Sequence, residues 1–455
     1  MKINKSPWIH QLNHDRKSIV ISSDVDTDIT IIGAGIAGVS TAFFTLKYTN
    51  QRVVMVDQGR LAHGATGHNA GQVVARFERP LKDIEDEFGF DMLRSALVDM
   101  QSTWKLIEEM YDDAGLDIVF SMTTARIGYS TLGQIVAELQ DFEIETRSGI
   151  EGNLFLINKD APFVNDIPKV FEKLYKLVPH EEILSKMETE DKSFQAVYID
   201  KAACVNSALF CQEVVIFLLK KYSDRFALYE NTHIKRVVLK NNHALLDAGK
   251  YTINASRVVL CTNGFENFDI FNEGGLAIDK KFHHLVNGTV GYMSGYLEKL
   301  NKDPIAIAYH DEKYDQLDSK NYYLYLTRRP HEYGDKTHNL ICMGGPEISI
   351  DDRAEYMRDY DYPEIIQSEI DNAIKKEYDS DPNHKIDYEF TWHGLMGYTP
   401  NRIRIIGEEP KNKVLLYNLG CNGIGIVPSI LGARRISKIL NREKVEPSIF
   451  DPRND

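Results

Sequence analysis

The chain has 455 residues, of which 43% are hydrophobic, so it can bury more than one sizeable core, and its length predicts two or three domains. The formal net charge of −14 disfavours a nucleic-acid surface, because binding to phosphate backbones usually needs a basic patch. We therefore expect a small-molecule substrate and no nucleic-acid partner.

No segment predicts a membrane span or a signal peptide. The longest purely apolar run extends from Val214 to Leu219, far short of the about 20 residues that cross a bilayer. The N-terminus has no apolar stretch of the signal-peptide kind, so a cytoplasmic location without a membrane partner is expected. The five cysteines are odd in number and include no CxxC pair, which predicts neither a disulfide framework nor a metal site.

A buried-strand pattern over Thr27–Ile32 leads straight into a glycine-rich turn and then a helix pattern. Gly33 permits the tight turn, Gly35 lets the backbone approach a pyrophosphate, and Gly38 lets the helix lie close to the strand. A second apolar run ends in Asp57, about 20 positions past Gly38, where a carboxylate can accept hydrogen bonds from ribose hydroxyls. Together these features predict a dinucleotide-binding βαβ unit whose cofactor-facing residues are Gly33, Gly35, Ile36, Ala37, Gly38, Asp57 and Gln58.

The elements that follow are predicted from apolar periodicity. The glycine-rich loop 61–72 is too long for an ordinary connection, and such loops usually hold a ligand. Helical patterns cover 83–115, 205–222 and 363–378, and strand patterns cover 227–239, 244–253, 257–261 and 388–392. The aromatic-rich region 282–345 alternates like an antiparallel sheet and is expected to form a wall of the substrate site. Because no Pro/Gly/Ser linker separates these parts, the domains should be interleaved.

Several motifs together resemble the D-amino-acid oxidase family of FAD-dependent oxidoreductases. They are the three glycines with Asp57, the loop Gly64–Gly71, the strand end Cys261–Gly264, and a C-terminal block made of Trp392–Pro400, Ile405–Gly407 and Leu419–Pro428. The resemblance covers nearly the whole chain. Ser6–Trp8 ahead of the first strand and the ending Phe450–Arg453 look closest to the γ-glutamylputrescine oxidase and glycine/sarcosine oxidase branch.

The resemblance implies an α/β fold: a Rossmann-like FAD/NAD(P)-binding domain with a discontinuous second domain of antiparallel sheet plus helices. The FAD-binding domain is expected from residues 1–85, 197–270 and 385–455. The substrate domain is expected from residues 86–196 and 271–384.

The implied cofactor is FAD rather than NAD. Beyond the βαβ unit, the residues implied to bind it are Ala65, Thr66, His68, Asn69, Ala70, Gly71, Gln72, Ile234, Thr262, Gly264, Asn422, Gly423, Ile424 and Gly425. Ile234 could also be an ordinary strand residue, and Thr262 and Gly264 a surface turn. A helix starting near Ile426, with Pro428 in its first turn, would direct its positive end at the flavin N1 and C2 carbonyl and favour acceptance of hydride.

His68 is open to two interpretations. In dimethylglycine and sarcosine dehydrogenases the matching histidine is linked to the flavin C8 methyl, whereas the noncovalent branch usually has arginine there. His68 therefore predicts either a covalent link to FAD or a neutral imidazole that packs beside the flavin.

The substrate residues depart from the family pattern. Many members have an arginine where this chain has Tyr325, and a guanidinium would clamp a substrate carboxylate. Arg328 and the adjacent Arg329 either are surface charges at a strand end, or one of them binds the substrate carboxylate instead. Tyr325 and Tyr398, with Tyr292 and Tyr323, suit an amine through cation–π or hydroxyl contacts, or are simply core residues. His393 is a candidate for tuning the amine proton, or a structural histidine. The candidate catalytic residues are thus His393, Tyr325, Tyr398 and Arg328.

The predicted function is oxidation of a C–N bond in a small amine or amino acid, with hydride passing to flavin and hydrolysis of the imine. One alternative is an amine dehydrogenase that uses an electron carrier instead of oxygen. The other is a flavoprotein subunit or scaffold without turnover, suggested by Tyr325 in the place of arginine. The sequence leaves the particular amine, the electron acceptor and the oligomeric state open.

Overall fold

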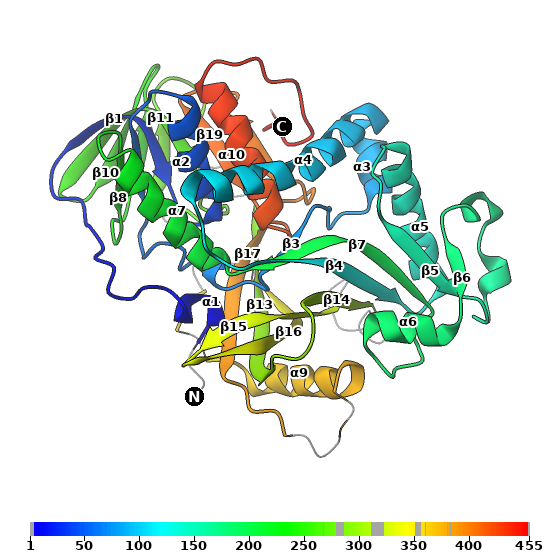
Figure 1. Ribbon diagram of the computed structural model, residues 1–455. Helices are drawn as coiled ribbons and strands as arrows, with labels where there is room; N and C mark the ends of the chain where they lie inside the picture. Colours follow the sequence, from blue (N-terminus) through cyan, green and yellow to red (C-terminus); the bar gives the residue numbers. More distant parts are fainter. Residues whose placement is uncertain are drawn as a thin grey trace.

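The computed structural model describes residues 4–266, 268–278, 286–310, 323–350, 356–359, 361–379, 381 and 385–453. Within these residues the chain forms two large sheets (Figure 1). Helices α2, α7 and α10 lie together beside the first sheet, and α9 lies beneath β13, β15 and β16 of the second. The fold is therefore α/β with a second part of mixed sheet and helices, which confirms the predicted fold class.

The first sheet has a parallel core in the order β8, β2, β1, β11, β19. Its strands are Phe226–Tyr229 (β8), Val53–Val56 (β2), Val25–Ile32 (β1), Tyr251–Leu260 (β11) and Leu415–Leu419 (β19). The sheet also contains Arg236–Leu239 (β9), Ala244–Ala248 (β10), Asp269–Asn272 (β12) and Ile405–Glu408 (β18). β2 and the second half of β1 are buried, as expected for parallel strands covered on both faces.

The second sheet is mostly antiparallel and runs in the order β17, β13, β16, β15, β14, β4, β7, β5, β6, with β3 paired to β7. Its strands are Phe390–Tyr398 (β17), Asn287–Lys299 (β13), Lys336–Ile350 (β16), Leu324–Tyr333 (β15), Ile305–His310 (β14), Phe120–Tyr129 (β4), Ala196–Val205 (β7), Leu154–Asn158 (β5), Lys176–Val178 (β6) and Gln72–Val74 (β3). The predicted antiparallel region 282–345 thus forms β13 to β16, apart from 282–285 and 311–322, which lie outside the described residues.

The helices begin and end where the sequence places capping residues. α2 starts after Gly35, α4 ends at the left-handed Gly115, and α5 has a capping box between Thr131 and Gln134. The helical segments are Pro7–His10 (α1), Ile36–Tyr48 (α2), Ala65–Gly67 (η1), Leu81–Phe88 (α3), Phe90–Ala114 (α4), Leu132–Arg147 (α5), Val164–Asp166 (η2), Lys169–Phe171 (η3), His180–Met187 (α6), Ser207–Lys221 (α7), Glu364–Glu377 (α9) and Ile426–Leu440 (α10).

The chain crosses between the two sheets several times. β3, most of β7, and β17 come from the ranges predicted for the FAD-binding domain, yet they are strands of the second sheet. The division into two domains therefore stays a prediction, and these three strands mark where the two sheets share chain segments.

Candidate active site and cofactor cavity

One cavity of about 1880 Å³ joins the two sheets. Its walls include the start of α2, the loop 61–72, the start of α10, and strands β4, β13 to β17 of the second sheet. A single small ligand usually occupies a pocket of about 300–1,000 Å³. The volume therefore suffices for a dinucleotide cofactor and a second, smaller molecule in the same space.

The glycine turn after β1 is held in the shape that the sequence predicts. Gly33 has φ +107°, and a Cβ there would lie 2.5 Å from the carbonyl oxygen of Cys261. A Cβ at Gly38 would overlap the carbonyl oxygen of Gly33, which is why α2 can lie so close to the strand. Both positions thus require glycine for backbone packing.

The start of α2 fits a dinucleotide. A Cβ at Gly35 would approach the Oγ1 atom of Thr66 to 2.9 Å, and Gly35 lines the cavity at the helix N-terminus, where backbone amides favour anions. Asp57 lines the same wall; its Oδ2 accepts from the Ala34 amide at 2.8 Å, and its Oδ1 accepts from the Gly59 amide at 2.7 Å. Each oxygen retains a lone pair for a ribose hydroxyl. The residues present therefore suit a pyrophosphate with its adjoining ribose.

The N-terminal segment fixes the glycine-rich loop. Ser6 Oγ donates to the Gly67 carbonyl at 2.5 Å, and Trp8 Nε1 donates to the Asn69 carbonyl at 2.5 Å. Trp392 Nε1 donates to that same carbonyl at 3.3 Å. The Ser6–Trp8 motif thus has a physical role: it anchors the loop that forms one wall of the cavity.

His68 lies at the end of η1 and its ring lines the cavity. Nδ1 is 3.0 Å from the carbonyl oxygen of Gly64, which only accepts, so Nδ1 carries the proton and donates. Burial, the largest cause, lowers the pKa of His68 to about 4, so the ring is neutral near pH 7. The Nε2 lone pair is left for another contact.

The C-terminal turn leads from β19 into α10. Gly423, Ile424 and Gly425 line the cavity, and α10 begins at Ile426 as predicted. Asn422 does not line it: its Oδ1 accepts from the Thr399 amide at 2.8 Å, so its side chain holds the turn.

The structure brings most of the predicted cofactor residues to one wall. Besides those already described, the cavity lining contains Ile36, Ala37, Gln58, Ala65, Thr66, Asn69, Ala70, Gly71, Gln72, Ile234 and Thr262. Gly38, Gly264 and Asn422 lie behind the wall. At Gly264, φ is +95° and a Cβ would collide with Val286. These three positions shape the wall instead of forming it.

The four candidate catalytic residues separate into two pairs. Tyr325 on β15 and Tyr398 on β17 line the cavity. His393 lies outside the lining; it is 1% exposed, and its Nδ1 is 3.2 Å from the hydroxyl of Tyr356, which does line the cavity. This geometry makes His393 a neighbour of the wall and gives less support to a direct role.

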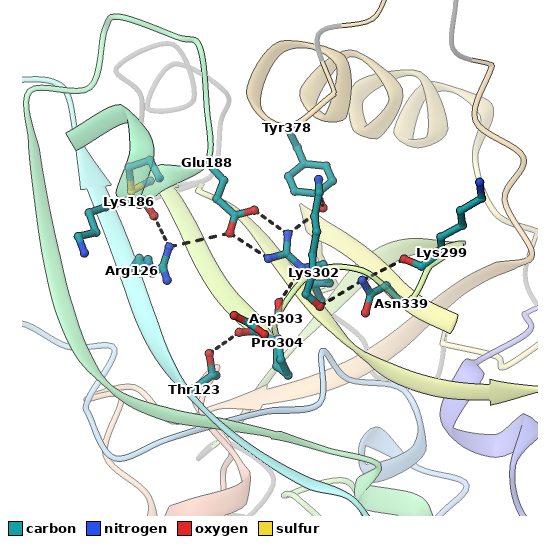
Figure 2. A network of polar contacts seen from close by, with 12 residues as sticks. Thr123, Arg126, Lys186, Glu188, Lys299, Lys302, Asp303, Pro304, Asn339 and Tyr378 are labelled. Atoms are coloured by element: carbon teal, nitrogen blue, oxygen red, sulfur yellow. Dashed lines mark hydrogen bonds and ion pairs between the residues drawn. The ribbon is translucent and has the colours of Figure 1, made fainter. Parts of the chain in front are cut away.

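Arg328 also lies outside the lining, and its partners Glu188, Asp303 and Tyr378 are labelled in Figure 2. It contacts both carboxylate oxygens of Glu188 at 2.6 and 2.9 Å, and it donates to the Asp303 carbonyl at 2.8 Å and the Tyr378 hydroxyl at 2.9 Å. Arg328 and Arg329 are 2% and 3% exposed, so the expectation of surface charges is wrong. Arg328 is oriented by Glu188 and Tyr378, which is the geometry of a structural ion pair.

The sequence did not single out the charged residues that line the cavity near the C-terminal glycine turn. Glu78, Glu347 and Arg402 lie there, together with Arg76 and Tyr323. Tyr323 donates to Glu78 Oε1 at 3.0 Å, and Arg76 Nη2 pairs with Glu138 at 3.0 Å. The one available signal was the run Arg76–Arg79, where three charges in four residues directly follow β3.

Within the described residues, no helix is both long and apolar enough to span a membrane. In the same residues, no group of three or more His, Cys, Asp or Glu side chains is arranged to hold a metal ion.

Among curated proteins, residues of this chain are 21% identical over 296 positions to the putative Rieske 2Fe-2S iron-sulfur protein YhfW of Bacillus subtilis, covering 64% of this chain and 50% of that protein. A second match, to γ-glutamylputrescine oxidoreductase of Escherichia coli, is 31% identical over 74 residues, covering 16% of this chain and 17% of that protein. The matches thus span half or less of the length of these relatives.

Among solved structures, glycine oxidase from Geobacillus kaustophilus superposes with a TM-score of 0.66 at 17% identity, covering 95% of this chain and 99% of that one. L-proline dehydrogenase from P. horikoshii superposes with a TM-score of 0.66 at 14% identity, covering 94% of this chain and 97% of that one. These two likenesses show a shared fold. The model of the family described as FAD-dependent oxidoreductases matches residues 28–439. The chain therefore belongs to this family of FAD-dependent oxidoreductases, and FAD is its cofactor.

Proposed function

We propose that this protein oxidises the C–N bond of a small amine or amino acid and releases an imine, which water hydrolyses to a carbonyl compound and an amine or ammonia. The observation that carries the proposal is the single cavity that connects the dinucleotide wall to a wall of phenols and ionisable side chains. FAD supplies the two-electron acceptor for the hydride from the carbon next to nitrogen.

The task of the chain is to position the amine. Oxidation requires the uncharged amine with its C–H bond directed at the cofactor, so orientation contributes more than a strong base. Tyr325 and Tyr398 offer phenol hydroxyls and ring faces at the same wall, and the pKa of each phenol is raised, first by burial. Both therefore stay protonated near pH 7 and act as hydrogen-bond partners.

A second candidate function is an amine dehydrogenase that passes electrons to a carrier. The relative YhfW is named as a putative Rieske iron–sulfur protein, and L-proline dehydrogenase from P. horikoshii shares the fold of this chain. Peroxide formation under air separates the two candidates: stoichiometric peroxide supports an oxidase, whereas turnover only with an artificial electron acceptor supports a dehydrogenase.

The test of the proposed function is an anaerobic flavin-bleaching screen of the FAD-loaded protein. The panel contains primary amines, N-methyl amino acids, α-amino acids and γ-glutamyl amines. Bleaching by at least one class, with formation of the matching carbonyl product, is expected. Failure of every class to reduce the flavin would contradict the proposal and favour the flavoprotein without turnover.

A further inference from the structure

We propose that Glu78 determines specificity by accepting a hydrogen bond from the ammonium form in which the substrate is captured, before the nitrogen releases its extra proton to solvent for oxidation, and that the substrate is an amine without a carboxylate on the carbon next to nitrogen. This inference rests on the proposed function and narrows its substrate class. It concerns charged residues of the cavity lining that the sequence did not single out.

The position of Glu78 places it opposite the C-terminal glycine turn. A Cβ built on Gly423 would lie 2.8 Å from Glu78 Cγ and 3.1 Å from the hydroxyl of Tyr398. Gly423 is the residue expected beside the flavin ring, and both side chains line the same cavity. A substrate nitrogen near the cofactor therefore has the Glu78 carboxylate within reach.

The Glu78 carboxylate has only one hydrogen bond from the part of the chain that the structure describes. Tyr323 donates to Oε1, and His310 stacks on Tyr323 with ring centroids 4.6 Å apart. Burial lowers the pKa of His310 to about 3, so this ring is neutral and adds no competing positive charge. Tyr323 fixes the orientation of Glu78 while the other oxygen, Oε2, remains available to a ligand.

The charges around this end of the cavity are unbalanced. Glu347 is a second carboxylate in the lining. Its pKa is raised to about 7, chiefly by burial and then by repulsion from Glu78. Arg402 supplies one opposing charge, while Arg76 is already paired with Glu138. Burial raises the pKa of Glu78, while the hydrogen bond from Tyr323 and the charges of Arg76 and Arg402 lower it. When Glu78, Glu347, Glu138, Arg402 and Arg76 are all ionised, one negative charge is left over. A bound ammonium would neutralise it, whereas a zwitterion would not.

The excess negative charge around this part of the cavity also disfavours a substrate carboxylate. Arg328 is committed to Glu188 outside the cavity. Arg402 lines the cavity, but its charge already acts on Glu78 and Glu347, and it lowers the pKa of both carboxyl groups. A carboxylate on the carbon next to nitrogen would lie close to Glu78 and be repelled by it. Tyr323 and Tyr325, with ring centroids 5.8 Å apart, instead offer aromatic surface to the alkyl part and the cation.

The test uses a matched pair of ligands that cannot turn over. tert-Butylamine has no hydrogen on the carbon next to nitrogen, so it binds as an ammonium without being oxidised, and pivalate is the carboxylate of the same shape. The FAD-loaded protein is titrated with each at pH 8, and dissociation constants are taken from the flavin absorbance change and from calorimetry. Wild type should bind tert-butylammonium more tightly than pivalate.

Glu78→Gln should weaken tert-butylammonium binding about ten- to hundredfold, as expected for loss of a hydrogen bond to a charged group, and should leave pivalate binding equal or tighter. Glu78→Asp should recover part of the affinity. The control is Glu87→Gln, which changes another carboxylate of the lining that is already paired with Arg79 and Arg453. Glu87→Gln should bind tert-butylammonium like wild type, and normal FAD content will verify that each variant is folded.

The inference is overturned if Glu78→Gln binds tert-butylammonium like wild type, or if pivalate is the better ligand of the wild type. Because neither ligand is oxidised, the measured dissociation constants are independent of the bleaching screen. Bleaching by α-amino acids but not by amines would retain the proposed function and reject the inference. Absence of all bleaching, with tert-butylammonium bound through Glu78, would reject the function and retain the cation site.

Discussion

The two ends of the cavity, which we propose hold FAD and the substrate, are built differently. At the cofactor end, the wall consists of glycines, helix N-termini and a loop, and backbone groups dominate. At the substrate end, it consists of side chains from β4, β14 to β17 and the segment after β3, many of them ionisable. Backbone recognition requires particular residues, because a Cβ would collide, whereas side-chain recognition depends on which side chains the fold brings together.

Burial shifts the pKa values of histidines and carboxyl groups in opposite directions at both ends of the cavity. It lowers the pKa of His68 at the cofactor end to about 4 and that of His310 at the substrate end to about 3. It raises the pKa of Asp57 at the cofactor end, and it raises the pKa of Glu347 at the substrate end, and of Asp141 and Glu145 nearby, to about 7. His68 therefore keeps a constant charge between pH 5 and 8, whereas Glu347 gains negative charge as the pH rises.

The largest effect is expected at the cofactor end. Gly35→Val should abolish FAD retention, because the side chain would take the place of the pyrophosphate and press on Thr66. We expect the dissociation constant to rise at least about a thousandfold, about 4 kcal/mol. Gly64→Ala is the matched control, since a Cβ there meets nothing within 4 Å. A Gly35→Val protein that purifies with a full complement of FAD would show that the glycine turn does not face the cofactor.

The next largest effect is expected at Gly423, where the two ends of the cavity meet. Gly423→Asp should slow flavin reduction about a hundredfold, because it adds a negative charge beside the reduced ring and crowds Glu78. Since Gly423 has φ +80°, Gly423→Ala measures the strain and crowding alone, and we expect a smaller loss. Stopped-flow anaerobic reduction measures both. Equal rates in Gly423→Asp and wild type would place the turn away from the flavin.

A third prediction tests whether the charge of Arg328 stabilises the fold or binds the substrate. Arg328→Gln should cost about 2 kcal/mol of unfolding free energy, because Glu188 loses its bidentate partner, and should leave amine binding unchanged. Chemical denaturation and ligand titration measure the two quantities. A double-mutant cycle with Glu188→Gln should show coupling between the pair. If amine affinity fell while stability stayed constant, Arg328 would belong to the substrate site after all.

His68 should show a smaller effect. His68→Ala should change the flavin absorbance spectrum and slow reduction roughly tenfold, about 1.4 kcal/mol, because the ring lines the cavity. Acid precipitation of the wild type decides the chemistry: colour in the pellet indicates a covalent link that His68→Ala should release, and free flavin in the supernatant indicates packing alone. An unchanged spectrum and rate in His68→Ala would mean that the loop does not contact the flavin.

The last prediction concerns the pH dependence of the free energy of unfolding. The pKa of Glu145 is raised to about 7 in the folded protein, mainly by burial, against about 4.3 in an unfolded chain. Its contribution to stability is therefore complete below about pH 4 and is lost as the pH rises through about 7. Glu145→Gln cannot ionise, so it should remove a decline in the free energy of unfolding of roughly 2 to 3 kcal/mol between pH 5 and 8. The exposed Glu151→Gln is the control, and a Glu145→Gln slope equal to that of wild type would rule out this titration.

The sequence by itself determined the cofactor end. Gly33, Gly35, Gly38 and Asp57 lie close together along the chain, and their spacing dictates local backbone geometry that any βαβ unit must adopt. The antiparallel region and the start of α10 at Ile426 were predicted for the same reason, since periodicity and a first-turn proline act locally.

Only the tertiary structure decided the substrate end. Glu78 follows β3, Tyr323 precedes β15 and Gly423 precedes α10, so no spacing along the chain predicts that they meet. The pairing of Arg328 with Glu188 also joins residues far apart in the chain and buries a residue that looked exposed. Strand register and the packing of one sheet against the other set these contacts, and a single-residue shift of a strand would turn its side chains to the opposite face. The sequence therefore identifies the family and its cofactor, while the choice of substrate depends on contacts that exist only in the folded chain.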